Sequence, residues 1–448
     1  MKSLRHLEVY RFGGLLNRIP AGIGQLTRLE TLSTFVVRNP SENGNESVAG
    51  IQELKGLNLI AGELTIKGLR HVHDPNDAQN AKLRSKTNIS ELTLWWSGGD
   101  DEGNIHPSLQ DNNSCKEVLE GLQPHPNLHL LAIEGYPGTI FPHWAGDFGK
   151  TLPKLHTLVL FLMPNVERWS SSLSSEGDVF HLPSGLKLLL LRGCPKLSLS
   201  ANFILPPSIE ELGLEKCNDP ELNTVENLPH LSFLSISAFD EIPEAPLKKL
   251  TSLKSLCISR CSKLKSLPTK LENLKTLTSL RIKDCEELAF LTEEEIRNLT
   301  SLGELKIENC QSLRSISISA SSSSSSGPNP HLTTLKSLEI DRCPELEISI
   351  IDFQHLVSLQ ELKLFSLPQL TCLPGQLQHV KTLQFLVIQN CINIETLPEW
   401  LLRHPPAGFH TLFISQCHPE LHRRCEKDKG EYWRKISHLR VQNIESLS

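Results

Sequence analysis

Hydrophobic residues recur along the chain in one short pattern. Leucine or isoleucine occupies its first, fourth and sixth positions, and a cysteine often follows at the ninth. The clearest copy, LKSLCISRCSKLKSLP, begins at Leu253 and places Cys261 at the ninth position. Further copies, most of them spaced by about 22 to 27 residues, begin at Leu128, Leu155, Leu186, Ile209, Leu231, Leu277, Leu302, Leu335, Leu359, Leu383 and Phe409.

This pattern predicts a stacked architecture. The alternation in Leu256-Cys257-Ile258 is the period of a short strand with one buried face, while Leu264 and Leu267 bury the returning segment. One repeat cannot cover its own apolar face, so neighbouring repeats must stack. We predict an α/β repeat fold: a curved leucine-rich-repeat solenoid with a parallel sheet on its concave face.

The repeats are not uniform. We predict irregular N-terminal leucine-rich repeats over residues 1–126, regular repeats over 127–425 and a C-terminal cap over 426–448. In the first part, two segments are predicted to form short helices that each open with a capping residue, 77–86 and 114–122. In the second part, the serine-rich segment 319–330 has low complexity and is predicted to be a disordered excursion from one repeat.

Charge and hydropathy limit the kinds of partner that are expected. The chain has 45 Lys and Arg against 51 Asp and Glu, a formal net charge of -6, so it lacks the basic field that holds nucleic acid. Charges near the N-terminus interrupt any signal-peptide core, and no segment is long and apolar enough to span a bilayer. We expect a soluble, cytoplasmic chain that does not act at a membrane.

Cysteine use indicates a structural role. A small, buriable side chain with a weak donor suits the point where the chain leaves the strand. The alternative, metal or redox chemistry, requires ligands that converge, whereas these positions are successive steps of the stack. An aspartate in their place would bury a charge. Eight of the 12 cysteines occupy the ninth position: Cys194, Cys217, Cys261, Cys285, Cys310, Cys343, Cys391 and Cys417.

Patterns typical of enzymes are absent or incomplete. The string Gly149-Lys150-Thr151 resembles the end of a phosphate-binding loop, but Trp144 stands where that loop requires a glycine. No nucleophile and base have a local signature. We therefore predict that the chain is not an enzyme and binds no cofactor and no small-molecule substrate.

A zinc site near the C-terminus is a weaker alternative. Cys417 is already a repeat position, and the surrounding stretch lies where a cap is required, so we favour a structural role and predict no metal. Two cysteines and two histidines nevertheless have a spacing that zinc accepts: Cys417, His418, His422 and Cys425.

The binding surface can be predicted from the strand pattern, because residues that flank the buried leucines point out of the concave face. The earlier repeats are apolar there and the later ones carry charges of both signs. A single charged position can simply be solvated, whereas exposed apolar residues need a partner, or the chain's own polar loop or helices, to cover them. We predict a partner-binding face formed by Trp95, Glu134, Phe161, Leu190, Arg192, Glu215, Arg281, Lys283, Glu308, Asp341, Lys363 and Phe365.

Several longer strings resemble one family. They are IGQLTRLETLSTFVV (23–37), NISELTLWW (88–96), VLEGLQPHPNLHLLAIEGYPGTIFPHW (118–144) and the terminal CHPELHRRCEKDKGEYWRKISHL (417–439). The chain resembles the leucine-rich-repeat region of plant intracellular nucleotide-binding leucine-rich-repeat immune receptors of the coiled-coil class. The resemblance implies a defence function, in which the repeats sense a pathogen effector or an effector-modified host protein. It also implies that they restrain the receptor's nucleotide-binding domain.

The chain departs from that family in one respect. Neither a coiled-coil segment nor a nucleotide-binding domain precedes the repeats. We therefore expect a fragment or a truncated form without the nucleotide switch, or a partner domain that covers this end of the repeats. A different class stays open, a substrate-recognition solenoid of a ubiquitin-ligase complex, although no F-box-like helical segment precedes the repeats.

Overall fold

The chain folds into two compact units, Met1–Asp219 and Pro220–Ser448, which we describe in turn. The predicted boundaries after residues 126 and 425 stay predictions. The serine-rich segment 319–330 lies outside the described residues. The computed structural model describes residues 3–8, 19–38, 48–96, 112–167, 169, 180–197, 203–217, 225, 227–242, 247, 249–268, 271, 273–296, 298–317 and 332–442.

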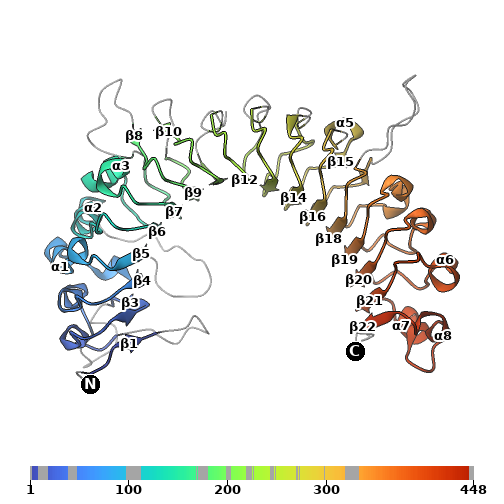
Figure 1. The fold of residues 1–448 in the computed structure, drawn as a ribbon, viewed down its shortest axis with the longest axis horizontal. Helices are drawn as coiled ribbons and strands as arrows, with labels where there is room; N and C mark the ends of the chain where they lie inside the picture. Colours follow the sequence, from blue (N-terminus) through green and yellow to red (C-terminus); the bar gives the residue numbers. More distant parts are fainter. Residues whose placement is uncertain are drawn as a thin grey trace. The chain divides into compact units, whose positions relative to one another are not determined.

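The first unit contains a parallel sheet of seven described strands that follow one another in chain order (Figure 1). Each strand pairs with the next, and the side chains of matched repeat positions lie opposite each other. The strands are β3 (Thr34–Val36), β4 (Gly62–Lys67), β5 (Ile89–Trp95), β6 (Leu130–Glu134), β7 (Thr157–Phe161), β9 (Leu188–Arg192) and β11 (Glu211–Glu215). Two short parallel pairs accompany them: β1 (His6–Leu7) with β2 (Thr31–Leu32), and β8 (Phe180–His181) with β10 (Phe203–Ile204).

Helical segments return the chain from one strand to the next and lie on the opposite side from the sheet in Figure 1. Strands stack about 4.8 Å apart, whereas helices need about 10 Å, so the unit bends towards its strands. The returning segments are η1 (Ile23–Gln25), η3 (Ile51–Gly56), η4 (Leu69–His71), α1 (Pro75–Asn80), η5 (Leu83–Ser85), α2 (Asn112–Gly121), η6 (His143–Asp147) and α3 (Phe148–Thr151).

The second unit repeats this plan with nine described parallel strands. They are β12 (Phe233–Ser237), β13 (Ser255–Ser259), β14 (Ser279–Lys283), β16 (Glu304–Glu308), β18 (Ser337–Asp341), β19 (Glu361–Phe365), β20 (Phe385–Gln389), β21 (Thr411–Ser415) and β22 (Arg440–Gln442). The other elements are β15 (Phe290–Leu291), β17 (Ser315–Ile316), α5 (Glu293–Ile296), η9 (Ile348–Ile350), η10 (Phe353–His355), η11 (Gly375–His379), α6 (Glu399–Arg403), α7 (Pro419–Cys425) and α8 (Trp433–Ile436).

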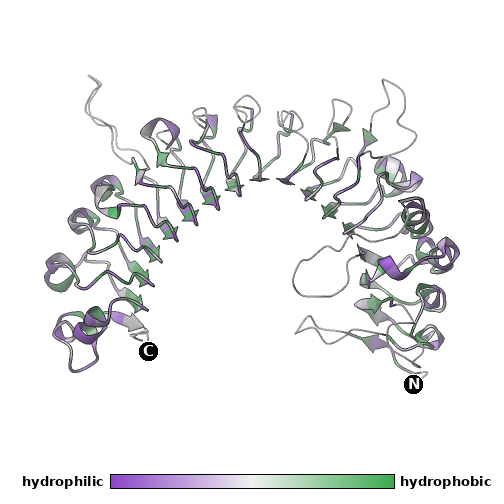
Figure 2. Cartoon of the chain, turned by 180° about the vertical axis from the view of Figure 1, so that it is seen from behind, coloured by the Kyte–Doolittle hydropathy of each residue, from purple (hydrophilic) through white to green (hydrophobic). Residues whose placement is uncertain are grey.

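The predicted repeats and the observed strands coincide. In every predicted copy from Leu128 to Phe409, the strand begins two residues after the opening residue. Buried and half-exposed residues alternate along most of these strands, and the opening residues are themselves buried. Figure 2 shows the corresponding hydrophobic stretches in successive strands of each unit. The prediction of a leucine-rich-repeat solenoid with a parallel sheet is confirmed.

The first predicted helix, 77–86, is wrong in its bounds. Helix α1 begins at Pro75, because the Asp74 side chain accepts a hydrogen bond from the Asn76 amide at 2.8 Å and caps the helix. It ends at Asn80, and Lys82 adopts a left-handed conformation with φ 53°. The second predicted helix, 114–122, corresponds to α2, which starts two residues earlier.

A left-handed residue follows most strands and ends the extended conformation. In the second unit its amide donates to the last carbonyl of the next strand, as in the bonds from Asn309 to Asp341 at 2.8 Å and from Ser366 to Gln389 at 2.9 Å. The residues with positive φ at this position are Gly68, Gly135, Leu162, Gly193, Lys216, Ala238, Arg260, Asp284, Asn309, Arg342, Ser366, Asn390 and Gln416.

Ala238 tests whether this left-handed conformation is strained. Its φ is 59°, and replacement by glycine removes only a methyl group. We expect Ala238→Gly to raise the free energy of unfolding by about 0.5 kcal/mol, because relief of the left-handed conformation outweighs the larger entropy of glycine in the unfolded chain. Ala289→Gly, at a position without positive φ, should lower it by about 0.5 to 1 kcal/mol. Urea unfolding of both variants checks the prediction, and equal signs would contradict it.

Buried aromatic rings form a continuous column in the first unit. Trp96 contacts Tyr136 edge-on with ring centroids 5.2 Å apart, and Tyr136 stacks on Phe141 at 5.8 Å. Phe141 then stacks on Trp169 at 5.6 Å, and Trp169 on Phe203 at 4.9 Å. Offset and edge-on aromatic pairs stabilise a core beyond the area they bury. The aliphatic repeat pattern gave no indication of this column.

One lysine of the first unit is buried. Lys86 is 1% exposed, and its ammonium group donates to the carbonyls of Leu54 and Leu57 at 2.7 and 2.9 Å. These carbonyls lie at the end of η3, in the preceding repeat, where a helical segment leaves acceptors without partners. Burial lowers the pKa of Lys86 to about 8. Lys86 therefore ties two neighbouring repeats together.

Candidate functional site

In the first unit, five of the predicted binding residues form one row across adjacent strands. Trp95 is opposite Glu134, Glu134 is opposite Phe161, Phe161 is opposite Arg192 and Arg192 is opposite Glu215. All five are half-exposed on the face that carries the strands' outward side chains, which we call the concave face of the unit. The register of the parallel sheet thus brings together residues that lie 120 positions apart in the sequence.

Charged side chains contact the aromatic rings of this row. The Lys67 ammonium lies 4.4 Å from the ring centroid of Trp95, and the Arg192 guanidinium lies 5.0 Å from that of Phe161. Arg192 also pairs with Glu215, with Nε and Oε2 2.5 Å apart. Arg192 is therefore held between an aromatic ring and a carboxylate. These two contacts restrict the side-chain conformations of Phe161, Arg192 and Glu215.

Leu190, the sixth predicted residue of this unit, lies two residues before Arg192 on β9, in the neighbouring row. It is opposite Gly213 on β11, and a Cβ added to Gly213 would lie 2.4 Å from Leu190 Cδ1. The glycine therefore leaves the space that Leu190 occupies. Helices α1 and α2 lie on the other side of the sheet in Figure 1, so they do not cover the apolar residues of this face.

The predicted residues of the second unit form two parallel rows. Lys283, Glu308, Asp341 and Phe365 are the last residues of β14, β16, β18 and β19, and each is opposite the next. Arg281 and Lys363 belong to the middle row, which Lys306 and Glu339 complete. The sheet thus brings all six predicted residues of this unit onto one face.

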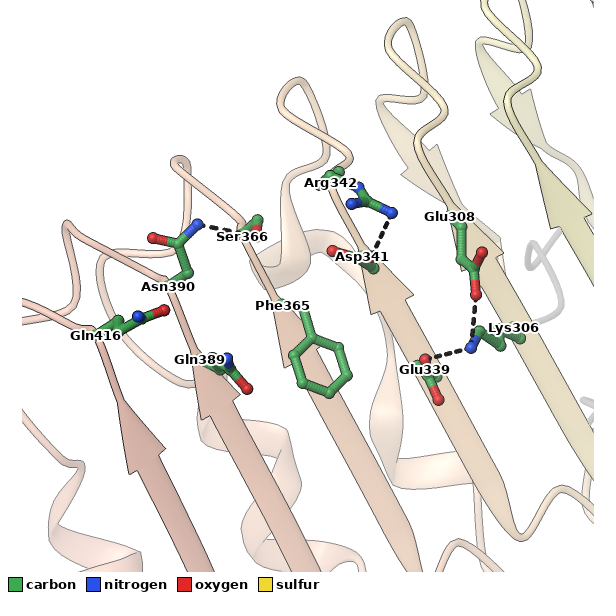
Figure 3. A pocket seen from close by; sticks show the side chains of 10 residues that line it. All are labelled: Lys306, Glu308, Glu339, Asp341, Arg342, Phe365, Ser366, Gln389, Asn390 and Gln416. Atoms are coloured by element: carbon green, nitrogen blue, oxygen red, sulfur yellow. Dashed lines mark hydrogen bonds and ion pairs between the residues drawn. The ribbon is translucent and has the colours of Figure 1, made fainter. Parts of the chain in front are cut away.

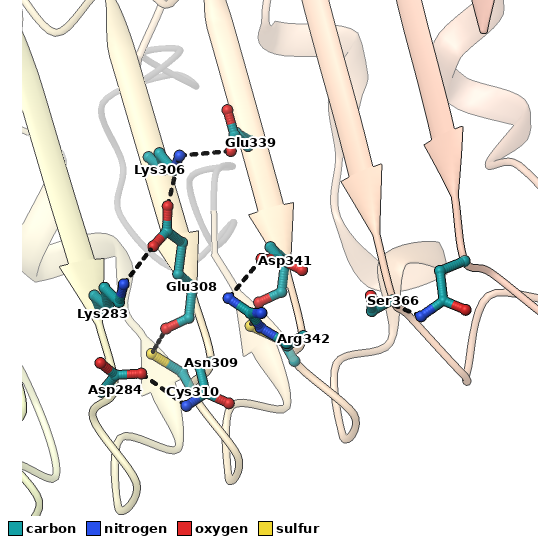
Figure 4. A network of polar contacts seen from close by, with 12 residues as sticks. Lys283, Asp284, Lys306, Glu308, Asn309, Cys310, Glu339, Asp341, Arg342 and Ser366 are labelled. Carbon is teal, nitrogen blue, oxygen red and sulfur yellow. Dashed lines mark hydrogen bonds and ion pairs between the residues drawn. The ribbon is translucent and has the colours of Figure 1, made fainter. Parts of the chain in front are cut away.

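An ion-pair network links the two rows (Figure 4). Lys306 Nζ lies 2.5 Å from Glu308 and 2.7 Å from Glu339, and Lys283 Nζ lies 3.5 Å from Glu308. Burial alone would raise the pKa of Glu308, but the hydrogen bond and charge of Lys306 outweigh it, and the pKa is lowered. Glu308 is therefore a stable carboxylate at neutral pH.

The negative charge of Asp341 is less well stabilised than that of Glu308. Its carboxylate lies 3.0 Å from the Arg342 guanidinium, yet burial, with the charges of Glu308 and Glu339, raises its pKa. Lys363, outside this group, pairs with Glu361 on its own strand at 2.8 Å. The charged form of Asp341 is therefore less stabilised than that of Glu308.

A cavity of about 340 Å³ opens beside Asp341 (Figure 3). Three predicted residues line it, together with the middle-row residues Lys306 and Glu339. The sequence prediction missed the others, although all of them follow from the repeat phase: Gln389 is a last strand position, and the rest are left-handed residues that directly follow a strand. The missed lining residues are Arg342, Ser366, Gln389, Asn390 and Gln416.

The cysteines at the ninth position act as predicted. Their thiols donate to backbone carbonyls at the strand ends, for example Cys310 to Glu308 at 3.5 Å and Cys417 to Ser415 at 3.4 Å. Burial raises the pKa of Cys194 to about 11 and of Cys391 to about 12. The thiols of Cys194 and Cys391 therefore stay protonated at neutral pH.

The phosphate-loop resemblance at Gly149-Lys150-Thr151 has a local structural explanation. These residues form most of α3, and Lys150 Nζ pairs with the carboxylate of Asp147 at 2.9 Å. The Thr151 hydroxyl donates to the carbonyl of Trp144 at 2.7 Å. A short capped helix accounts for the string.

His422, a candidate zinc ligand, has a structural partner. Its Nε2 accepts a hydrogen bond from the Cys417 amide at 3.0 Å, and the ring is buried. Within the described ranges, no group of three or more His, Cys, Asp or Glu side chains could hold a metal ion. His422 thus holds α7 against the end of β21.

This contact predicts a pH dependence. Burial lowers the pKa of His422, so between its folded value and about 6.5 the unfolded chain binds more protons. The C-terminal segment should therefore have full stability above about pH 6.5 and lose up to about 1.4 kcal/mol per pH unit below it. Hydrogen exchange of 417–425 between pH 8 and 5.5 measures the loss. His422→Gln should flatten the profile, the exposed His438→Gln should leave it unchanged, and a flat wild-type profile would refute the prediction.

Parallel strands stacked in register, with buried leucines and outward polar rows, define a leucine-rich-repeat protein. A leucine-rich-repeat protein of Leptospira interrogans has the same fold, with a TM-score of 0.53 at 17% identity over 96% of this chain and 93% of that one. Residues 51–194 match the family of R13L1/DRL21 leucine-rich repeats. The chain is a leucine-rich-repeat region of the kind found in plant disease resistance proteins, which confirms the resemblance.

The relatives are longer than the region they share with this chain. Putative disease resistance protein RGA4 of Solanum bulbocastanum is 30% identical over 95% of this chain and 38% of its own length. Disease resistance protein RGA2 of the same species is 32% identical, and a putative disease resistance RPP13-like protein 1 of Arabidopsis thaliana is 29% identical. These two matches cover 55% and 54% of this chain but only 27% and 29% of the relatives.

Among the described residues, no helix is long and apolar enough to cross a membrane.

Proposed function

We propose that this chain is the protein-recognition module of a plant innate immune receptor. Its concave face binds a pathogen effector or a host protein that an effector has modified. One observation carries the proposal: the sheet aligns Trp95, Phe161 and Arg192 in a single half-exposed row, and these are the residue types that anchor protein interfaces. The similarity to plant disease resistance proteins supports the defence role.

The chain binds rather than catalyses. Its buried thiols are engaged with carbonyls, and the charged groups of its second unit are paired with one another along the sheet. An extended face of this kind suits a protein surface better than a small substrate, which binds in an enclosed cleft. We place the module in the cytoplasm, with the receptor's nucleotide-binding domain as a second partner.

The experiment begins with the intact chain as bait in extracts of infected plant tissue. Recovery of a pathogen effector or a nucleotide-binding domain favours the proposal, and recovery of ubiquitin-ligase scaffolds contradicts it. The recovered partner is then purified, and its affinity for the chain is measured directly.

Replacing Trp95, Phe161 and Arg192 together by alanine should weaken that affinity by at least about 30-fold, since one such anchor contributes about 2 kcal/mol. A matched control replaces two exposed residues outside the strands, Leu59 and Val357, by alanine. The control should bind normally, and circular dichroism should show that both variants fold. Normal binding by the triple variant would refute the site assignment.

A further inference from the structure

The concave face of the first unit shows how this fold holds a guanidinium group. Arg192, the last residue of β9, lies over the ring of Phe161 at 5.0 Å and contacts the Glu215 carboxylate at 2.5 Å. Phe161 and Glu215 are the last residues of the two flanking strands. An aromatic ring and a carboxylate in this row therefore form a site for an arginine side chain.

The second unit also has a ring and a carboxylate in its last-position row, but here they lie on adjacent strands, whereas Phe161 and Glu215 flank the strand that carries Arg192. Asp341 and Phe365 are the last residues of β18 and β19 and lie opposite each other. Within the described part of the chain, no lysine or arginine lies over the Phe365 ring, and Arg342 contacts Asp341 from the position beyond the strand. Figure 3 shows Phe365 between the charged residues of β16 and β18 and the amide side chains Gln389, Asn390 and Gln416.

The environment of Asp341 favours a further cation. Three carboxylates line the cavity, those of Glu308, Glu339 and Asp341. Lys306 is shared between Glu308 and Glu339, Lys283 also pairs with Glu308, and Arg342 pairs with Asp341. Burial and the charges of Glu308 and Glu339 nevertheless raise the pKa of Asp341, so a second cation beside this carboxylate would stabilise its charged form.

We infer that this cavity receives an arginine side chain of the bound partner protein, which stacks on Phe365 and pairs with Asp341. This inference rests on the proposed function and specifies the chemistry of the partner. Arginine fits better than lysine because its planar guanidinium can stack on a ring and pair with a carboxylate at the same time. The amide oxygens of Gln389 and Asn390 can accept its remaining N–H groups. A volume of about 340 Å³ admits one long side chain.

The test uses the intact chain and two small probes, N-acetyl-arginine amide and its neutral citrulline analogue, titrated by ligand-observed saturation-transfer NMR. The arginine probe should bind at least about tenfold more tightly than the citrulline probe, because only the arginine probe carries a positive charge to pair with Asp341. Asp341→Asn should weaken arginine binding by about tenfold, and Phe365→Leu by about threefold. Arg281→Gln, exposed on β14 outside the cavity, should leave it unchanged.

A further variant leaves both of these contact residues in place. Gln389→Arg, on the strand beside Phe365, supplies an internal guanidinium and should abolish binding of the arginine probe while the chain remains folded. Equal binding of the two probes, or unchanged binding by Asp341→Asn or by Gln389→Arg, would overturn the inference. If the triple variant still loses its protein partner in that case, the proposed function stands alone. If arginine binds but the triple variant keeps its partner, the assignment of Trp95, Phe161 and Arg192 to the binding site fails while the arginine site remains.

Discussion

Cys310→Asp should be one of the most destabilising single substitutions in the second unit. Cys310 is fully buried, and its thiol donates to the Glu308 carbonyl at 3.5 Å, a group to which a carboxylate cannot donate. Its nearest ladder neighbours are Cys285 and Cys343, which supply no positive charge. An unpaired buried carboxylate costs about 3 to 5 kcal/mol, or roughly 10 °C in the melting temperature of a unit of this size.

The chain contains its own control, because Cys372 is exposed. Cys372→Asp should change the free energy of unfolding by less than about 0.5 kcal/mol. Cys310→Ser, which keeps a donor, should cost about 1 kcal/mol. Urea unfolding measures all three variants. Similar midpoints for the two aspartate variants would show that the cysteine ladder is not a buried structural element.

The Cys310→Asp variant should also gain a pH dependence. Burial raises the pKa of a carboxyl group in the folded state, so the penalty should be absent below the unfolded value of about 3.9 and grow as pH rises above it. The neutral carboxylic acid can donate to the Glu308 carbonyl, as the thiol does. A cavity or packing defect alone would lower stability equally at every pH, so the profile separates the two causes.

The sequence predicted the strands well because the pattern that specifies each strand lies within a few consecutive residues. A strand needs only the alternation of buried and outward residues. This alternation recurs in each repeat, from Leu131-Ala132-Ile133 to Leu412-Phe413-Ile414. The register of the parallel sheet then follows from the repeat phase. For this reason the residues predicted for the binding face lie in rows, from Trp95 to Glu215 and from Lys283 to Phe365, while their role in binding stays a prediction.

The cavity-lining residues that the sequence prediction missed have a fixed place in the repeat, but most of them lie just beyond the alternating strand pattern on which the prediction was based. Arg342 and Asn390 reach the rim of the cavity because the chain turns through a left-handed conformation directly after each strand. Glycine marks that conformation in Gly135 and Gly193, but later repeats use larger residues. The aromatic column depends on rings from different returning segments, such as Phe141 and Trp169, whose spacing in sequence carries no periodic signal.

Lys86 illustrates the same limit at a single residue. In sequence it closes the predicted helix 77–86, where a lysine is normally solvated. The helix stops at Asn80 instead, Lys82 turns with φ 53°, and η5 carries Lys86 inwards to the carbonyls of the preceding repeat. A prediction that extends the helix to residue 86, nearly two turns too far, therefore places this side chain in solvent instead of in the core.

Lys86→Ala should strongly destabilise the returning side of the first unit. It removes the hydrogen bonds to the carbonyls of Leu54 and Leu57 and leaves both acceptors buried beside a cavity. Unsatisfied buried acceptors cost about 1 to 3 kcal/mol each, so a loss of about 3 kcal/mol is expected at pH 7. The exposed Lys55→Ala, in η3, is the matched control and should be nearly neutral.

The titration of Lys86 gives this prediction a second readout. Its pKa is lowered to about 8 by burial, so between pH 8 and the unfolded value of about 10.4 the unfolded chain binds more protons. The stability of the first unit should therefore rise with pH in that window, by up to about 1.4 kcal/mol per pH unit. Lys86→Gln, which keeps a neutral donor, should abolish the rise while retaining part of the stability at pH 7. If Lys86→Gln and the wild type show the same slope, another group titrates and Lys86 is not the buried tie between the two repeats.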